Sequence, residues 1–220
     1  MRALFTEAIG TFFLVLSYGL AVNQDVNLAA VSIGVTLMVM VYAGAPHSGA
    51  HYNPAVSLGL TLSGALPARR LAPYWCAQFA AAILASLLAL KFTGDPLIVH
   101  PYAKATWQKV MAGELLGTFA LVYVVLHVAT GRGRAGNGYY GFAIGGTVMA
   151  LAIGIGPITG GSFNPAIGFA TAAVTLWLGA DHQVAPWIYL AGPCAGAALA
   201  AVAFRYQEGG NDAAPAAKPS

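Results

Sequence analysis

The chain has 220 residues, of which 58% are hydrophobic and only 8% are charged, and its mean hydropathy is +0.70. Soluble domains usually have about a quarter of their residues charged, so this composition excludes a water-facing surface and predicts a protein of the lipid bilayer. The net charge of +3 comes from few residues and does not indicate a nucleic-acid partner.

Six apolar segments are long enough to cross a bilayer, which takes about 20 helical residues. In chain order they are 3–22, 28–45, 71–91, 106–129, 139–157 and 185–205. Two further segments, 54–64 and 165–177, begin with proline and are about half that length. Because proline suits the first turn of a helix, each is predicted to be a half-helix that follows irregular backbone. Such backbone occurs at membrane depth only where it lines a cavity or is buried in protein.

The two halves of the chain repeat each other. The segment Glu7–Phe12 returns as Glu114–Phe119, and Ser48–Ala55 returns as Thr159–Ala166. Each half holds three full spans, an odd number, so the halves insert in opposite senses and their shared site lies near the membrane midplane. We therefore predict one channel domain over 1–205, made of inverted repeats at about 3–93 and 106–205. The polar segment 206–220 is predicted to be a disordered cytoplasmic tail.

Loop charges predict the orientation, because lysine and arginine gather on the cytoplasmic side. One side of the membrane would carry Arg2, Arg69, Arg70, Arg132, Arg134, Arg205 and Lys218. The other side would carry Lys91, Lys104 and Lys109. This excess predicts a multi-pass protein of the cell (inner) membrane with both termini in the cytoplasm.

The tripeptides Asn53-Pro54-Ala55 and Asn164-Pro165-Ala166 open the two half-helices. A helix N-terminus carries unpaired N–H groups and about +0.5 of a charge. An asparagine cap uses its side-chain oxygen on these N–H groups, which leaves its amide N–H2 free to donate into a pore. Two such ends meeting at mid-membrane would bind a permeating hydroxyl and repel cations and protons. The alternative is that each asparagine only caps its helix.

These paired motifs, the repeated Glu-x-x-Gly-Thr and the six spans resemble the aquaporin (major intrinsic protein) family over about residues 3–205. The resemblance implies an all-α membrane fold, with six transmembrane helices and two re-entrant half-helices in an inverted repeat. It also implies a right-handed bundle and a homotetramer with a separate pore in each subunit. It implies no cofactor.

The same resemblance implies roles for the re-entrant loops. Backbone carbonyls in both loops would form a ladder of acceptors along the pore, at Gly49, Ala50, His51, Gly160 and Ser162. Glu7 and Glu114 would accept hydrogen bonds from the loops, which is a scaffold role rather than proton transport. A titrating gate at His51 is the alternative to a packing role for that residue.

Family channels narrow at four positions, which alignment on the asparagines and on Pro157 places at Ile33, Ala152, Gly161 and Ile167. Water-selective members carry an aromatic residue, a histidine, a small residue and an arginine there, whereas glycerol channels carry aromatics and the arginine. None of the four side chains in this chain donates a hydrogen bond. We therefore expect a wider and more apolar opening without a fixed cation.

These features predict a passive channel for small uncharged solutes, meaning water and larger solutes such as glycerol, urea or metalloid hydroxides. A strict water channel is one alternative, and a non-conducting structural membrane protein with a dry filter is another. An ion channel would need a charged ring at the mouth. No nucleophile is paired with a base, so no enzyme is expected. No metal site is expected either, and Cys76 and Cys194 are interpreted as buried packing thiols.

Overall fold

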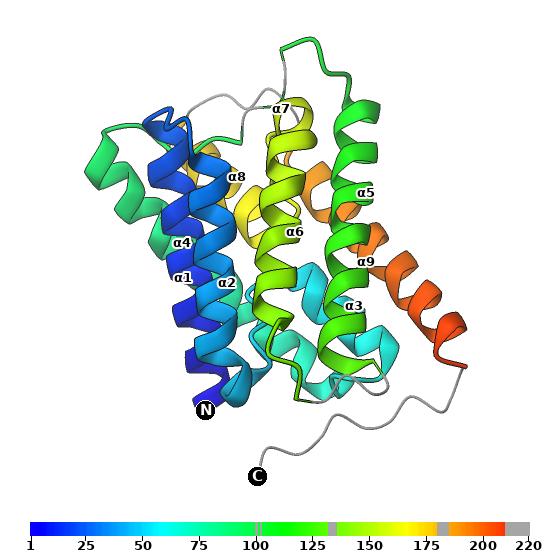
Figure 1. Ribbon diagram of the computed structural model, residues 1–220. Helices are drawn as coiled ribbons and strands as arrows, with labels where there is room; N and C mark the ends of the chain where they lie inside the picture. The colour runs from blue at the N-terminus through cyan, green and yellow to red at the C-terminus, as the bar shows by residue number, and fades with distance from the viewer. Residues whose placement is uncertain (100, 102, 132–135, 180–184, 210–220) are drawn as a thin grey trace.

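In the computed structural model, the described residues are 1–99, 101, 103–131, 136–179 and 185–209. They fold into helices joined by loops (Figure 1). The helices are α1 (Arg2–Asn23), α2 (Ala29–Ser48), α3 (Pro54–Ser63), η1 (Ala68–Arg70), α4 (Leu71–Thr93), α5 (Trp107–Val125), η2 (Leu126–Thr130), α6 (Tyr140–Gly154), α7 (Gly156–Thr159), α8 (Pro165–Trp177) and α9 (Ile188–Gln207). The predicted all-α fold is confirmed for this part of the chain.

The two halves run in opposite directions and interlock. In Figure 1, α1 rises from the end of the bundle that holds the N-terminus, whereas α5 descends toward that end. Within the halves, α1 packs against α4 and α5 packs against α9. Between them, α2 packs against α6, α3 against α9, and α8 against α4. Each half-helix therefore contacts a long helix of the other half, which holds both of them inside the bundle.

Five helices are long and apolar enough to cross a membrane, by length and composition, within the described residues. The predicted span 139–157 differs, because α6 ends at Gly154 and the short helix α7 starts at Gly156. The 15 residues of α6 extend about 22 Å at roughly 1.5 Å per residue, less than the hydrocarbon thickness of about 30 Å. The last predicted span, 185–205, also differs at its end. Helix α9 continues to Gln207, so the first two residues of the predicted tail are helical.

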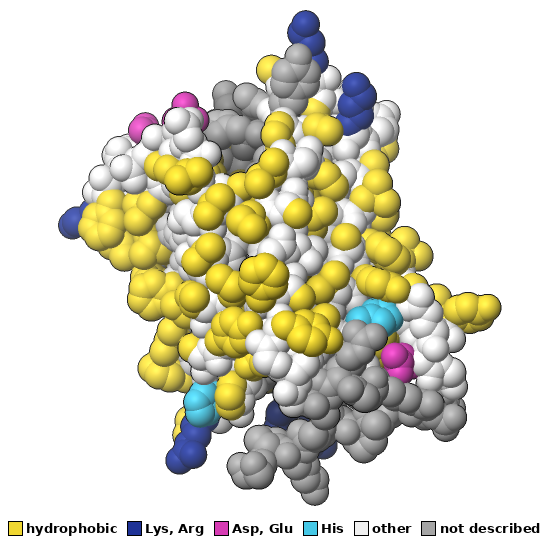
Figure 2. Space-filling view, viewed as in Figure 1, with side chains coloured by type: hydrophobic (Ala, Val, Ile, Leu, Met, Phe, Trp, Pro, Cys, Tyr) yellow, Lys and Arg dark blue, Asp and Glu magenta, His cyan; other side chains and the backbone are white. Residues whose placement is uncertain are grey.

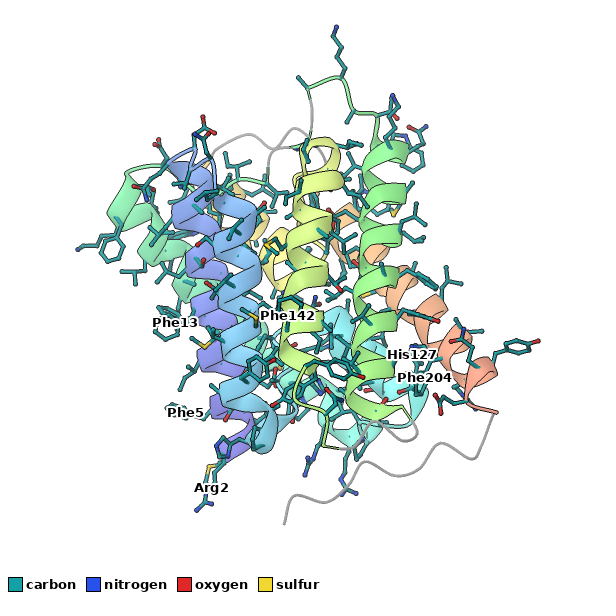
Figure 3. The ribbon with its side chains drawn as sticks, viewed as in Figure 1. Arg2, Phe5, Phe13, His127, Phe142 and Phe204 are labelled. Carbon is teal, nitrogen blue, oxygen red and sulfur yellow. The ribbon has the colours of Figure 1, made fainter. Side chains whose placement is uncertain are left out.

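The surface is that of a protein in lipid. On the face shown in Figure 2, hydrophobic side chains cover the middle of the molecule, and charged side chains gather at its two ends. Large exposed apolar residues include Phe5, Phe13 and Phe142, labelled in Figure 3. Cys76 is also exposed and Cys194 is half-buried, so the expectation of two buried thiols is wrong for Cys76. Of the residues used to predict orientation, Arg132, Arg134 and Lys218 lie outside the described part of the chain.

A π-helical turn joins the end of α5 to the end of α9. His127 lies in this turn, η2, and its Nδ1 is 2.7 Å from the carbonyl oxygen of Tyr123. Its Nε2 is 2.8 Å from the side-chain oxygen of Gln207. The imidazole also packs edge-on against the ring of Phe204, with ring centroids 5.1 Å apart (Figure 3). His127 thus ties the two helices together, which agrees with a packing role.

Two glycines allow α2 and α6 to touch closely. A Cβ atom added at Gly145 would lie 2.4 Å from the carbonyl oxygen of Gly34, and one added at Gly34 would lie 2.7 Å from the carbonyl oxygen of Gly145. Small residues commonly permit such close backbone approach between membrane helices. Because α2 and α6 each present side chains to the interior, this contact sets the spacing of the cavity walls described below.

The next residue in α6 supplies a matched control for this contact. We expect Gly145→Ala to destabilise the protein by about 1–3 kcal/mol, since the added methyl group meets backbone that cannot move aside cheaply. Gly146→Ala makes the same chemical change where nothing lies within 4 Å of the added atom. Thermal unfolding of the purified protein in detergent checks both variants. Equal melting temperatures for Gly145→Ala and wild type would contradict this packing.

Candidate functional site

Each half-helix begins at its proline and is capped by the preceding asparagine. The Oδ1 atom of Asn53 accepts a hydrogen bond from the backbone N–H of Ala55 at 2.8 Å. The Oδ1 atom of Asn164 accepts the equivalent bond from Ala166 at 2.9 Å. Both asparagine side chains are buried. The capping expected from the sequence is therefore present in the structure at both motifs.

The two asparagines also link the two loops to each other. The Nδ2 atom of Asn53 donates to the carbonyl of Phe163 at 2.9 Å, and Nδ2 of Asn164 donates to the carbonyl of Tyr52 at 3.0 Å. Because an amide has two N–H groups, only one on each asparagine remains for a solute. The prediction of a wholly free amide N–H2 is corrected accordingly: half of its donor capacity fixes the opposite half-helix.

Glu7 of α1 gathers the first loop around its carboxylate. It accepts hydrogen bonds from the Ser48 hydroxyl at 2.7 Å and from the backbone N–H groups of His51 at 2.9 Å and Tyr52 at 2.7 Å. It also accepts one from the side-chain amide of Gln78 at 2.9 Å. Glu7 has no exposed surface, so these donors replace the water that a carboxylate would otherwise bind.

Glu114 of α5 repeats this arrangement in the second loop. Its carboxylate accepts from the Thr159 hydroxyl at 2.8 Å and from the backbone N–H groups of Ser162 at 3.1 Å and Phe163 at 2.7 Å. Phe163 has a φ of 46°, and its counterpart Tyr52 has a φ of 52°. Such left-handed backbone costs roughly 1–2 kcal/mol for a residue other than glycine. The carboxylate bonds to these same residues stabilise that conformation.

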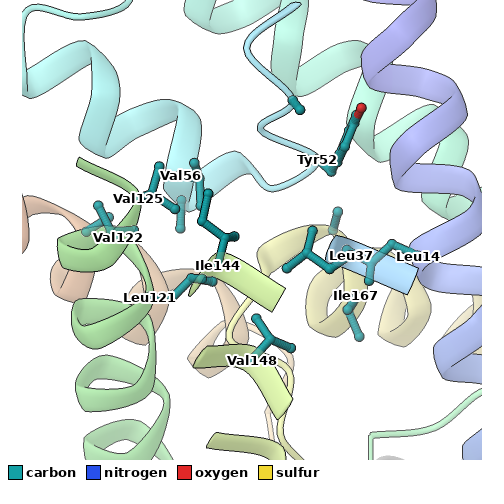
Figure 4. Close-up of a cluster of buried hydrophobic side chains, with 14 of the residues drawn as sticks. Leu14, Leu37, Tyr52, Val56, Leu121, Val122, Val125, Ile144, Val148 and Ile167 are labelled. Carbon is teal, nitrogen blue, oxygen red and sulfur yellow. The ribbon is translucent and has the colours of Figure 1, made fainter. Parts of the chain in front are cut away.

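A narrow cavity lies where the loops meet, with a volume of about 30 Å³. Since one water needs about 10–15 Å³ by this measure, it holds only a few water-sized molecules. Figure 4 shows Leu14, Leu37 and Ile167 among the buried apolar side chains of this region. The apolar side chains that line the narrow cavity include Leu14, Ile33, Leu37, Leu121, Val148 and Ile167. Both cap asparagines line it as well.

The structure brings the four predicted filter residues close together. Ile33, Gly161 and Ile167 all line the narrow cavity, and the Cα atom of Ala152 would lie 3.9 Å from a Cβ atom added at Gly161. Ala152 lies on α6 one turn beyond Val148, and it is only half-buried. That a small residue at 152 widens the opening stays a prediction.

The predicted pore carbonyls lie in different places. Ala50, His51 and Ser162 line the narrow cavity. Gly49 lines a second, wider cavity of about 390 Å³. This cavity lies where α2 ends and α6 begins, and these helix ends are at the end of the bundle near the N-terminus (Figure 1). We call it the terminal vestibule, and its lining includes Pro46, His47, Gly49, Arg70, Thr130 and Tyr140. Gly160 lines neither of these two cavities.

The carbonyl of Gly160 is held by a residue that the sequence did not indicate. The hydroxyl of Tyr18 on α1 donates to it at 2.6 Å, across 142 positions of sequence. Tyr189 and Tyr74 donate to the carbonyls of Thr159 and Ser48, the last residues of α7 and α2 before the two loops. Tyr18 thus adds a further anchor to the second loop, directly before Gly161. A tyrosine in an apolar span gives no signal of such a role.

The fold and these contacts define a class of protein. Membrane-length helices enclose two half-helices that meet end to end around a narrow cavity, and the cavity is lined by amide donors and apolar side chains. Irregular backbone of this kind is tolerated at membrane depth where it lines a passage. This arrangement is that of a membrane channel.

Comparison with known proteins agrees with this class. The family model described as Major intrinsic protein matches residues 1–204. Aquaporin NIP1-4 of Oryza sativa subsp. japonica is 37% identical over 214 residues, which cover 93% of this chain and 76% of the relative. Aquaporin NIP1-3 of the same plant is 39% identical over 209 residues, covering 90% of this chain and 71% of the relative.

Among solved structures, the aquaglyceroporin from Plasmodium falciparum has a similar fold. The TM-score is 0.79 at 21% sequence identity, over 94% of this chain and 96% of that one, and at this identity the likeness concerns the fold alone. The chain belongs to the major intrinsic protein family, as its paired motifs predicted. It is a multi-pass membrane protein from a family of channels for water and small solutes, and its relatives are channels rather than enzymes.

The support that Glu114 gives to the second loop can be tested with an isosteric change. In Glu114→Gln the side-chain nitrogen cannot accept a hydrogen bond, so at least one of the donors from Thr159, Ser162 or Phe163 loses its acceptor. A buried donor without a partner costs about 1–3 kcal/mol, and we expect a lower thermal unfolding temperature in detergent. Asp25→Asn, which removes a charge from an exposed loop, should leave it unchanged. An equal effect of both changes would show that loss of charge alone is responsible.

Proposed function

We propose that this protein is a passive channel for small uncharged solutes, which are water together with larger neutral molecules such as glycerol, urea or metalloid hydroxides. One observation carries the proposal. The narrow cavity combines amide donors and loop backbone with aliphatic side chains, and no aspartate, glutamate, lysine or arginine of the described residues lines it. Such a lining offers hydrogen bonds to a neutral solute on one side and apolar contact on the other.

The ring proposed to set selectivity is Ile33, Ala152, Gly161 and Ile167. Ile33 and Ile167 are both buried and line the narrow cavity. Water that passes them gives up hydrogen bonds worth about 0.5–1.5 kcal/mol each. A solute with C–H groups gives up fewer, and it gains contact with the isoleucine side chains. This difference supports passage of neutral solutes with some apolar surface.

A strict water channel is the second candidate, and the size of the narrow cavity favours it. A volume of about 30 Å³ admits water in single file, whereas glycerol or urea would require side chains such as Ile33 or Ile167 to move. The two candidates therefore differ in one measurable quantity, which is the ratio of solute flux to water flux.

The assembly and orientation are part of the proposal. We propose a homotetramer with one pore in each subunit, in the cell (inner) membrane and with both termini in the cytoplasm. Membership of the family supports the tetramer. The excess of lysine and arginine expected on the terminal side supports the orientation. We propose neither a cofactor nor an enzymatic activity.

Stopped-flow light scattering on proteoliposomes tests the proposed function. Wild-type protein should pass water, and should also pass glycerol, urea and undissociated arsenous acid faster than protein-free liposomes do. Ile167→Arg should reduce the solute fluxes about tenfold or more while retaining water flux, because a long charged side chain narrows the ring and holds water. Such a loss is equivalent to about 1.4 kcal/mol in the barrier.

Ile167→Met is the matched control, since methionine is flexible, apolar and similar in volume, and it should keep the solute fluxes within a few-fold of wild type. Water flux without solute flux in the wild type would identify a strict water channel. If neither water nor solute passed, the protein would be a non-conducting membrane protein. Equal solute fluxes in Ile167→Arg and wild type would remove residue 167 from the filter.

A further inference from the structure

The terminal vestibule adjoins the narrow cavity. Ala50 and His51 line both spaces, so a solute in the vestibule lies next to the loop that carries Asn53. The vestibule is more than ten times larger, at about 390 Å³ against about 30 Å³. Ions in the vestibule can therefore remain hydrated. The charge of the lining side chains acts on them there, and close packing of the walls does not.

Within the described residues, the one Lys or Arg side chain that lines this vestibule is Arg70. The lining also includes the imidazoles of His47 and His51, and no aspartate or glutamate. Arg70 and its neighbour Arg69 are both exposed, and of the two only Arg70 lines the vestibule. Arg70 forms no ion pair with a carboxylate of the described residues.

Arg70 is placed against the wall that supports the first loop. Its guanidinium group interacts with the hydroxyl of Tyr74, and this hydroxyl donates to the carbonyl of Ser48 at 2.8 Å. Ser48 in turn donates to Glu7 and caps the backbone N–H of Ala50. The positive charge of Arg70 thus lies beside the loop that carries the first half-helix, in an exposed part of the vestibule wall.

A fixed charge in a recess with low-dielectric walls has a stronger effect than the same charge on an open surface, because the walls focus the field. Such a charge lowers the local concentration of cations and does not act on neutral molecules. Rings of arginine or lysine act in this way in pores that reject cations. In the narrow cavity, which Ile167 lines, no lysine or arginine of the described residues supplies such a charge.

We propose that Arg70 is a selectivity residue of the terminal vestibule, where it reduces the access of cations, protons included, to a pore whose narrow ring holds no fixed charge. This inference rests on the proposed function, since it concerns what a neutral-solute channel rejects. It assigns the electrostatic rejection of cations that enter from the vestibule end of the pore to Arg70. These cations meet that charge before they reach the N-terminal ends of the half-helices.

Proton flux into proteoliposomes tests this assignment. Vesicles that contain a pH-sensitive dye are held at a potassium diffusion potential with valinomycin, and glycerol and water fluxes are measured on the same preparations. Arg70→Ala should raise proton flux about fivefold, as expected for removal of one unit charge near a water-filled path, and Arg70→Glu should raise it further. Arg70→Lys should behave as wild type, because it keeps the charge.

Arg69→Ala is the matched control, since it removes the same charge one residue away from the vestibule, and its proton flux should equal that of wild type. The effect of Arg70→Ala should also shrink at 1 M salt, where the screening length falls to about 3 Å. Unchanged water and glycerol fluxes in these variants would show that the pore is intact.

The inference is overturned if proton flux is the same in wild type, Arg70→Ala and Arg70→Glu while neutral flux persists. It is also overturned if Arg69→Ala raises proton flux as much as Arg70→Ala does. Absence of water and glycerol flux in the wild type is a different result, because it refutes the proposed function itself and the inference with it.

Discussion

The structure depends on holding two helix N-termini face to face in the middle of a membrane. Each end carries about half a positive charge and several unpaired N–H groups, so the two ends repel each other and need acceptors. The chain supplies them in pairs. Asn53 and Asn164 cap their own helices and also donate to the opposite loop at 2.9 and 3.0 Å. Because each asparagine holds the other half in place, neither half-helix can shift without disturbing both.

The carboxylates behind the loops complete this arrangement from the side away from the cavity. Glu7 and Glu114 accept hydrogen bonds from loop N–H groups. The loop carbonyls are therefore available as acceptors for other donors. Glycines make room for the loop aromatics: a Cβ atom at Gly10 would lie 2.1 Å from the ring of Tyr52, and one at Gly117 would lie 2.4 Å from the ring of Phe163. The repeated Glu-x-x-Gly-Thr pattern therefore has the same role in both halves. Its glutamate accepts hydrogen bonds from the loop backbone, and its glycine leaves space for the aromatic ring of the loop.

The parts of the fold that follow from hydropathy and proline placement could be predicted from the sequence. The half-helices start at Pro54 and Pro165 as predicted, because proline at the first turn combines a fixed φ with a missing N–H. The end of α6 at Gly154 could not be predicted, since the residues up to Pro157 are equally apolar and only packing decides where the helix breaks. The exposure of Cys76 was missed for a similar reason: in a membrane, apolar surroundings do not distinguish the lipid-facing side of a helix from its buried side.

The candidate site divides in the same way. Positions next to the asparagines could be located, because local geometry fixes Gly161 and Ile167 relative to the caps, and both line the narrow cavity. Ala152 was placed by alignment along a helix, where one turn moves a residue by about 5.4 Å. It lies next to Gly161 but does not line the narrow cavity. The bond from Tyr18 to Gly160 joins residues 142 positions apart, and no local pattern in one sequence encodes such a pair.

If Ile167 stands where family channels carry a fixed cation, as proposed, the physical basis on which the pore discriminates between solutes changes. A charged ring separates solutes by the sign of their charge, whereas an aliphatic ring separates them by the cost of removing their water. That cost is greatest for ions of either sign, smaller for water, and smallest for neutral molecules with few hydrogen bonds for their size. The half-helix ends add a repulsion of cations that originates in the backbone and survives any change of side chain. Under the proposed function, both the rejection of ions and the acceptance of apolar neutral solutes would draw on Ile33 and Ile167, which line the narrow cavity, and Arg70 would add repulsion of cations in the terminal vestibule.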